Sequence, residues 1–283
     1  GQGTDDYRCF LLDPHLARDS YLTGTHVLPG NPDVVHHVIL FRLSPEQVAE
    51  AEAVDAASEG QGWTCFGGSG VSGEFANVED ANWLGAWAPG GKETMTKKGF
   101  GVDLPAGSRI VMQVHYNLLA GAGPDMSSTQ LRLTPQRPGV TELHTFLMPG
   151  PVEMPCRPDR SSSPLCNREA SIADAIERIG PEGGFTANAL HILCNTVPTP
   201  SDTTSCTRSL NRGMTVYGVA GHMHLLGRHI TLTTNAGTPE EKTILDIEPW
   251  NFDDQGSDPI EPLHLDVGDT VTVTCEHAQW LRD

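Results

Sequence analysis

The chain of 283 residues contains 18 Lys and Arg against 36 Asp and Glu, which gives a formal net charge of −18 at pH 7. A surface of this charge would repel phosphate-rich partners, so we expect no binding to nucleic acid. No apolar run approaches the roughly 20 residues of a membrane-spanning helix, so we expect no membrane insertion. The 30 glycines and 21 prolines favour short strands and turns over long helices, and hence an all-β fold.

Strand signals recur along the whole chain as short apolar or alternating runs bounded by turn residues. Loops rich in Gly, Pro and Ser separate them, and one helix is expected at 170–179 in the second half. The predicted strands are 7–12, 25–28, 34–41, 110–116, 187–194, 214–220, 229–233, 243–247 and 270–275.

A second short helix is predicted in the first half of the chain. Ser44 is a typical helix N-cap, Pro45 suits the first helical position, and Gln47 stands at the capping-box position. The alanine- and glutamate-rich continuation extends this surface helix to about Ser58.

The segment 136–139 has the composition of a linker between two strand-rich halves. We therefore expect two domains, 1–136 and 137–283, each built as a β-sandwich. The oligomeric state is left open by the sequence.

Seven cysteines indicate an oxidising compartment, because four of them bracket short polar loops. Cys156 and Cys166 enclose one such loop, and Cys194 and Cys206 enclose another, so each pair is predicted to form a local disulfide. Because seven is an odd number, one cysteine is left without a disulfide partner within the chain. A chain that starts at Gly1 suggests processing, and we expect a secreted or periplasmic protein whose signal peptide has been removed.

Five of the 12 histidines lie in apolar strand contexts. The flanking residues are typical of β-structure, so His222 and His224 are predicted on a strand, which places both imidazoles on one face where they could hold a metal ion. Such a pair can also be two polar side chains on a half-exposed face with no metal. The adjacent His36 and His37 would point to opposite faces of a flat strand, so sharing an ion requires a bulge, a strand end or different ring nitrogens. His115 alone would be read as a core histidine.

These histidines belong to a set of six stretches that resemble one known family. The chain resembles the copper type II, ascorbate-dependent monooxygenases, the family of peptidylglycine α-hydroxylating monooxygenase and dopamine β-monooxygenase. The six stretches follow the family's order over nearly the whole chain: Tyr7-Arg8-Cys9, Val35-His36-His37-Val38-Ile39-Leu40-Phe41, Trp63-Thr64-Cys65, Ala86-Trp87-Ala88-Pro89, Gln113-Val114-His115-Tyr116 and His222-Met223-His224-Leu225-Leu226-Gly227.

The resemblance implies two copper sites, one in each of two jelly-roll-like domains that face each other across a cleft. His36, His37 and His115 match the three ligands of the electron-transfer copper in the N-terminal domain. His222 and His224 match two ligands of the oxygen-binding copper in the C-terminal domain.

The resemblance also implies a reaction and further roles. The family hydroxylates a C–H bond with O2 and takes electrons from ascorbate, and neutral imidazoles suit both Cu(I) and Cu(II). Gln113 flanks the third ligand as it does in the family, and we expect it to take part in catalysis together with His222 and His224. Cys9 and Cys65 match a family disulfide.

The chain departs from the family in two places. The family's second copper has a methionine ligand C-terminal to the His-x-His, and no methionine follows Met223 here. The family's partner for Cys275 lies beside that methionine, so we expect a missing C-terminal segment or, alternatively, a variant with an incomplete oxygen site. Ala220 stands where the peptidylglycine enzymes carry an arginine that meets the peptide carboxylate, so a small organic substrate is expected in place of peptide amidation.

Two other classes of protein compete with the monooxygenase hypothesis. A non-catalytic protein that stores, senses or delivers copper could use the same fold, and oxygen consumption with ascorbate would distinguish it. A cupin-like iron enzyme also uses His-x-His on a β-sandwich, but it needs a glutamate shortly after the second histidine. Residues 225–230 contain none, so this hypothesis ranks last.

Overall fold

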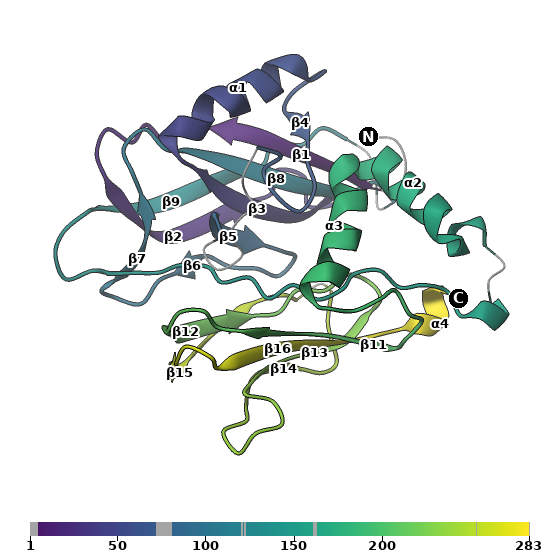
Figure 1. Ribbon diagram of the computed structural model, residues 1–283. Coiled ribbons are helices and arrows are strands. Elements are labelled where there is room, and N and C mark those ends of the chain that lie inside the picture. The colour runs from purple at the N-terminus through teal and green to yellow at the C-terminus, as the bar shows by residue number, and fades with distance from the viewer. Residues whose placement is uncertain are drawn as a thin grey trace. The chain divides into compact units, whose positions relative to one another are not determined.

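The computed structural model describes residues 5–71, 81–119, 121, 123–160, 163–252 and 254–282. Contacts between residues separate the chain into two compact units, which we describe one at a time. The first unit comprises Gly1–Leu147 with Arg178–Glu182, and the second comprises Met148–Glu177 with Gly183–Asp283. Most of the regular structure in both is antiparallel β-sheet, as Figure 1 shows.

One antiparallel sheet of the first unit carries three of the four strands predicted in the first half. Its central strand is the predicted 110–116 segment, with the predicted 7–12 and 34–41 segments on its two sides. The strand order is β4 (Trp63–Thr64), β1 (Asp5–Leu12), β8 (Arg109–Asn117), β3 (Val35–Leu43) and β5 (Trp83–Trp87).

Strand β3 is a continuous apolar run because both of its faces are covered. Val38 and Leu40 point into the core shared with the other sheet, whereas Ile39 and Phe41 point into a core that includes Trp63. Burial on both faces removes the alternation of polar and apolar residues that a one-sided sheet would show.

The second sheet of this unit packs on the first through a common apolar core. That core contains Leu22 and Leu104 from the second sheet together with Val38, Ile110 and Val114 from the first. The second sheet consists of β10 (Thr141–Glu142), β7 (Phe100–Leu104), β2 (Ser20–Leu28), β6 (Thr94–Met95) and β9 (Ser128–Pro135), with β9 paired to β2.

The first unit extends beyond the predicted linker at residue 136. Strand β10 pairs in parallel with β7, and an isolated bridge joins Ala81 to Thr145. These pairings keep the chain with the first unit as far as Leu147.

The predicted helix after β3 is present. A single 3₁₀ turn, η1 (Pro45–Gln47), leads into α1 (Val48–Ala57), and Ser44 is the N-cap. The backbone nitrogen of Ser44 donates to Oε1 of Gln47 at 3.2 Å, which is half of a capping box. Ala51 is buried against the outer face of the first sheet, in the same core as Phe41.

The second unit contains two antiparallel sheets. An apolar core on the larger sheet includes Met223, Ile230, Trp250 and Val273. The larger sheet has the order β11 (Thr203–Ser209), β16 (Thr270–His277), β13 (Gly227–Thr234) and β14 (Lys242–Ile247), and the smaller pairs β12 (Met214–Ala220) with β15 (Ser257–Leu265).

The prediction of a strand at 187–194 is wrong, because this segment lies in a helix. Helix α3 (Pro181–Leu193) begins with a proline at its first position and follows α2 (Arg168–Ile179), which confirms the helix predicted at 170–179. Gly184 allows close packing of the two helices, since a Cβ there would lie 2.8 Å from Cδ1 of Ile176. A short apolar run does not by itself distinguish helix from strand. The remaining short helices are η4 (Pro158–Arg160), η5 (Pro164–Cys166) and α4 (Gln279–Arg282).

Three disulfides are present, and they are typical of proteins from oxidising compartments. Both predicted local disulfides form, and so does the pair implied by the family resemblance: Cys9–Cys65, Cys156–Cys166 and Cys194–Cys206. Cys275 has a free thiol. Within the described segments, no helix has the length and apolar character that crossing a membrane requires.

Candidate metal centres

Three histidines converge at one end of the first sheet. Nδ1 of His37 lies 3.3 Å from Nδ1 of His36 and 3.3 Å from Nδ1 of His115. One ring nitrogen of each histidine lies within 4.8 Å of those of the other two, and all three side chains are buried. We call these three residues the first histidine centre.

A β-bulge in β3 lets two adjacent histidines share this centre. Val35 pairs with Tyr116 and His37 pairs with His115, so two residues on β8 oppose three on β3 and His36 is the extra residue. The bulge removes the alternation that would send neighbouring side chains to opposite faces. The sequence left three possibilities open: a bulge, a strand end or the use of different ring nitrogens. The protein has a bulge, and His36 and His37 both direct Nδ1 toward the centre.

The donor set fits a metal ion that imidazole binds well, such as copper or zinc. Ligands about 2.0 Å from a metal in trigonal or tetrahedral geometry lie roughly 3.3–3.5 Å apart, which matches the two measured nitrogen separations. Burial lowers the pKa of His115, against the opposing effect of its hydrogen bond to Asp5, so its imidazole is neutral at pH 7 and can bind a metal. Neutral imidazoles accept copper in both oxidation states.

Two residues of β1 fix the ring of His115. The Tyr7 ring stacks on it, with ring centroids 4.2 Å apart and planes inclined by 5°. Oδ1 of Asp5 lies 2.8 Å from its Nε2, on the side of the ring away from the other histidines. Neither residue was assigned a role at the metal from the sequence, because each is more than 100 positions from His115.

Gln113 lies on the same face of β8 as His115 but takes part in a structural contact. Its Nε2 donates to the carbonyl oxygen of Gly68 at 2.7 Å and lies 3.5 Å from Sγ of Cys65. The side chain is 1% exposed. The contacts of Gln113 anchor the loop that follows the Cys9–Cys65 disulfide, and its predicted catalytic role stays a prediction.

His222 and His224, the second histidine pair, are brought together in the second unit. Their Nε2 atoms lie 3.3 Å apart, and both residues are exposed. They lie in the loop between β12 and β13, so their prediction as strand residues is wrong. Met223 between them is buried in the core, whereas the two histidines are exposed.

Gly221 explains why the chain leaves the strand here. A Cβ at this position would lie 3.0 Å from Cδ1 of Ile247 and 3.1 Å from Cγ2 of Ile230, so a larger residue would push the loop off the core. A turn then follows, in which the backbone nitrogen of Gly227 donates to the carbonyl oxygen of His224 at 2.9 Å.

The second histidine pair offers two nitrogen donors. Within the part of the chain that the structure describes, no further His, Cys, Asp or Glu joins it to make a group of three. Nδ1 of His222 donates to Oε1 of Gln255 at 2.7 Å, so Nε2 carries the lone pair that faces His224. Burial raises the pKa of the Cys275 thiol to about 11, which keeps this cysteine protonated at pH 7.

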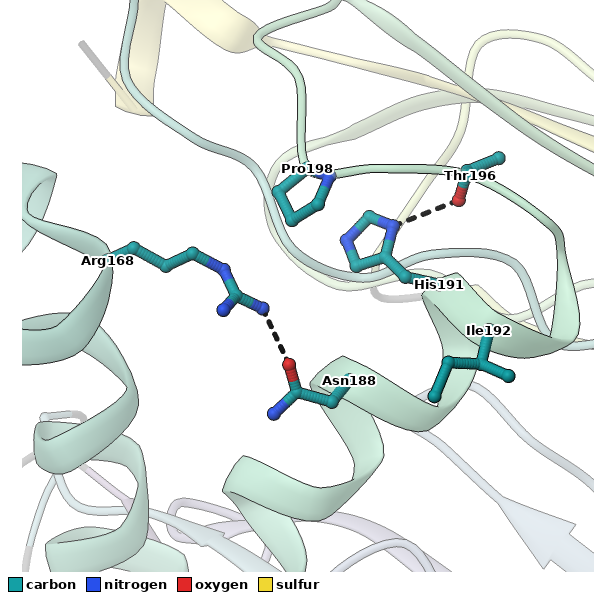
Figure 2. A pocket seen from close by; sticks show the side chains of 6 residues that line it. All are labelled: Arg168, Asn188, His191, Ile192, Thr196 and Pro198. Atoms are coloured by element: carbon teal, nitrogen blue, oxygen red, sulfur yellow. Dashed lines mark hydrogen bonds between the residues drawn. The ribbon is translucent and has the colours of Figure 1, made fainter.

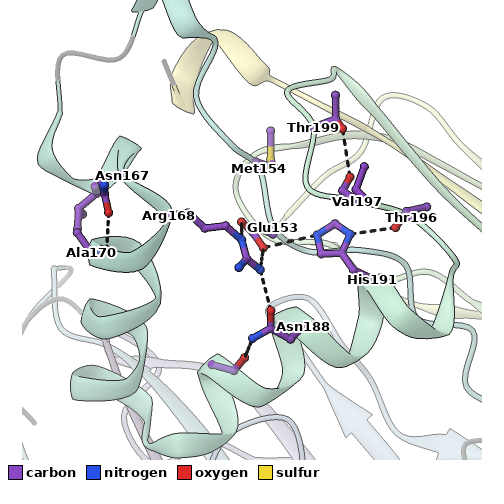
Figure 3. A network of polar contacts seen from close by, with 12 residues as sticks. Glu153, Met154, Asn167, Arg168, Ala170, Asn188, His191, Thr196, Val197 and Thr199 are labelled. Carbon is purple, nitrogen blue, oxygen red and sulfur yellow. Dashed lines mark hydrogen bonds and ion pairs between the residues drawn. The ribbon is translucent and has the colours of Figure 1, made fainter.

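The second unit also contains a cavity of about 440 Å³, which sequence reasoning did not indicate. Figure 2 shows Arg168 of α2 pointing toward Asn188 of α3, with His191 further along α3, and Figure 3 shows the polar network around them. Glu153 accepts two hydrogen bonds from Arg168, at 2.7 and 2.9 Å. Nε2 of His191 lies 3.5 Å from the same carboxylate.

The ion pair between Arg168 and Glu153 ties the start of α2 to the segment that precedes it. Asn188 completes the connection by accepting from Nη2 of Arg168 at 2.8 Å. We assign this polar network a structural role.

Comparison with protein-family models gave no match, and comparison with curated protein sequences gave none either.

Proposed function

We propose that this protein is a copper- and O2-dependent monooxygenase that hydroxylates a C–H bond of a small organic substrate with electrons from an ascorbate-like reductant. The observation that carries the proposal is the convergence of three buried Nδ1 atoms in the first histidine centre. The second histidine pair supports it, because two Nε2 atoms meet at 3.3 Å in an exposed loop.

The two groups of histidines differ in their exposure to solvent and therefore in their proposed roles. His36, His37 and His115 hold one ion with neutral nitrogens and, being buried, keep bulk water and substrate away from it. His222 and His224 are exposed, so small molecules can reach an ion held there. Copper, when bound, would supply one-electron transfer at the first histidine centre and chemistry with O2 at the second histidine pair.

The overall reaction balances with one reductant of the ascorbate class. The substrate R–H and O2 take up two electrons and two protons and yield R–OH and water. Ascorbate supplies both electrons and both protons as it becomes dehydroascorbate. Ala220 presents a methyl group two positions before His222, so no guanidinium there clamps a carboxylate, and a small substrate with a benzylic or aliphatic C–H bond fits better than a peptide terminus.

Oxygen consumption tests this proposal. We expect copper-loaded protein to consume O2 with ascorbate and a panel of benzylic and aliphatic compounds, and to transfer label from ¹⁸O2 into one product. His115→Ala should abolish the transfer of ¹⁸O into the product. His264→Ala, which alters an exposed histidine of β15, should leave this transfer unchanged. Copper-loaded protein that labels no compound of the panel and consumes no more O2 than His115→Ala would contradict the proposal.

One observation favours a second candidate function, the non-catalytic binding of copper. The second histidine pair has two nitrogen donors, and no methionine follows Met223 that could add a thioether. A copper-delivery protein would bind the metal at the first histidine centre and release it to a chelator without consuming O2. Absence of ascorbate-dependent O2 uptake by fully loaded protein would support this function.

A further inference from the structure

The two groups of histidines differ in what holds the ring nitrogen that points away from each group. Nε2 of His115 donates to a carboxylate oxygen of Asp5 at 2.8 Å. Nδ1 of His222 donates to the carboxamide oxygen of Gln255 at 2.7 Å, and this carboxamide is oriented by its own donation to the carbonyl oxygen of Phe252 at 2.8 Å. The outer partner is therefore an anion in the first unit and a neutral amide in the second.

We propose that Asp5 is a positioning residue that keeps the proton of His115 on Nε2, aims its Nδ1 lone pair at the first histidine centre and makes that centre favour oxidised copper. The proposal rests on the function proposed above. A carboxylate that accepts from the outer N–H of a ligating imidazole fixes the tautomer and strengthens the nitrogen as a donor. A stronger donor beside a negative charge stabilises Cu(II) more than Cu(I).

The geometry around His115 allows Asp5 to act in this way. Asp5 and Tyr7 stand two residues apart on β1, so both side chains lie on the face of the sheet that His115 occupies. Tyr7 covers one face of the imidazole while Asp5 meets its edge. The Asp5 side chain is 46% exposed, whereas the His115 side chain is 5% exposed.

The difference between the two outer partners has a consequence for electron flow. A centre that favours the oxidised metal is the stronger reductant, so Asp5 biases the first histidine centre toward giving up its electron. The neutral Gln255 adds no such bias at the second histidine pair. Asp5 thus supports the assignment of electron transfer to the first centre and of oxygen chemistry to the second pair.

The test uses protein in which His222→Ala and His224→Ala leave the first histidine centre as the copper site. Asp5→Asn, with nearly the same shape, should lower the affinity for Cu(II) relative to Cu(I) about tenfold. That ratio corresponds to an upward shift of about 59 mV in the one-electron reduction potential. Asp6→Asn is the matched control for charge alone, because Asp6 is the next residue of β1, acts on His115 through its charge and has its carboxylate 3.7 Å from Nε of Arg8. We expect less than about a twofold change in the control.

A second readout needs no metal. Nitrogen-15 NMR of the metal-free protein should show His115 protonated on Nε2, and Asp5→Ala should give a mixture of both tautomers. Potentials and tautomers that stay the same in Asp5→Asn, Asp5→Ala and Asp6→Asn would overturn the inference. If the parent protein retains no copper, the proposed function fails, while the tautomer of His115 still decides whether Asp5 positions the ring.

Discussion

His36 is the residue on which the first histidine centre depends most directly. As the extra residue of the bulge, it allows Nδ1 of two consecutive imidazoles to meet at 3.3 Å. A regular strand would place one of the two rings on the opposite face of the sheet, in the core that contains Val38. The bulge is therefore the local distortion that gives a buried strand a candidate metal site.

The hydrogen bond between His222 and Gln255 gives a prediction for the second histidine pair. Replacing Gln255 by Leu removes the acceptor, so Nδ1–H of His222 is no longer held and the ring can rotate away from His224. We expect copper affinity at this pair to fall about tenfold, as measured by competition with a chelator in the His115→Ala background. Gln130→Leu, on an exposed position of β9, makes the same chemical change away from both groups and serves as the control. Equal affinities in the two variants would contradict this role for Gln255.

At the scale of elements, one imidazole links three strands of the larger sheet in the second unit. His229 on β13 lies 2.8 Å from Oδ1 of Asp246 on β14 and 3.3 Å from Oε1 of Glu276 on β16. Hydrogen bonding to Asp246 raises the pKa of His229, against the opposing effect of burial, and Glu276 raises it further. The imidazolium therefore stabilises the packing of these strands.

This link predicts a pH dependence of stability. Because the folded-state pKa is raised, the contribution of His229 is fully present below its unfolded-state value, near 6.5, and is lost as pH rises through the folded-state pKa. We expect Asp246→Asn to lower the melting temperature more at about pH 6 than at about pH 8. An equal loss at both pH values would show that Asp246 acts without the charge on His229.

The elements that sequence analysis recovered include the most strongly buried strands, together with the less buried β12 and β14. Strands β3 and β8 carry long apolar runs and were predicted, whereas β9 has mostly exposed or half-buried residues and β15 contains two prolines, so neither resembles a buried strand. Helix α3 was predicted as a strand because its apolar segment is short. Contacts between residues far apart in the sequence cannot be predicted from local patterns. Asp5 and His115 are 110 positions apart, and no motif connects them.

At the scale of the whole molecule, the ligand histidines come from elements fixed by buried cores and disulfides. The first histidine centre lies on a sheet covered on both faces, next to the Cys9–Cys65 disulfide. The second histidine pair is held by burial of Met223 and by the close approach of Gly221 to the core. Sequence motifs predicted which histidines come together, and the fold explains how residues from distant strands reach one point.

The copper content of the chain after anaerobic loading with Cu(I) and desalting tests the central claim most directly. We expect about two coppers per chain in the parent and in His264→Ala, about one in His115→Ala, and about one when His222 and His224 are both replaced by Ala. A parent protein that retains no copper, or a His115→Ala variant that retains as much as the parent, would contradict the assignment of these histidines as copper ligands.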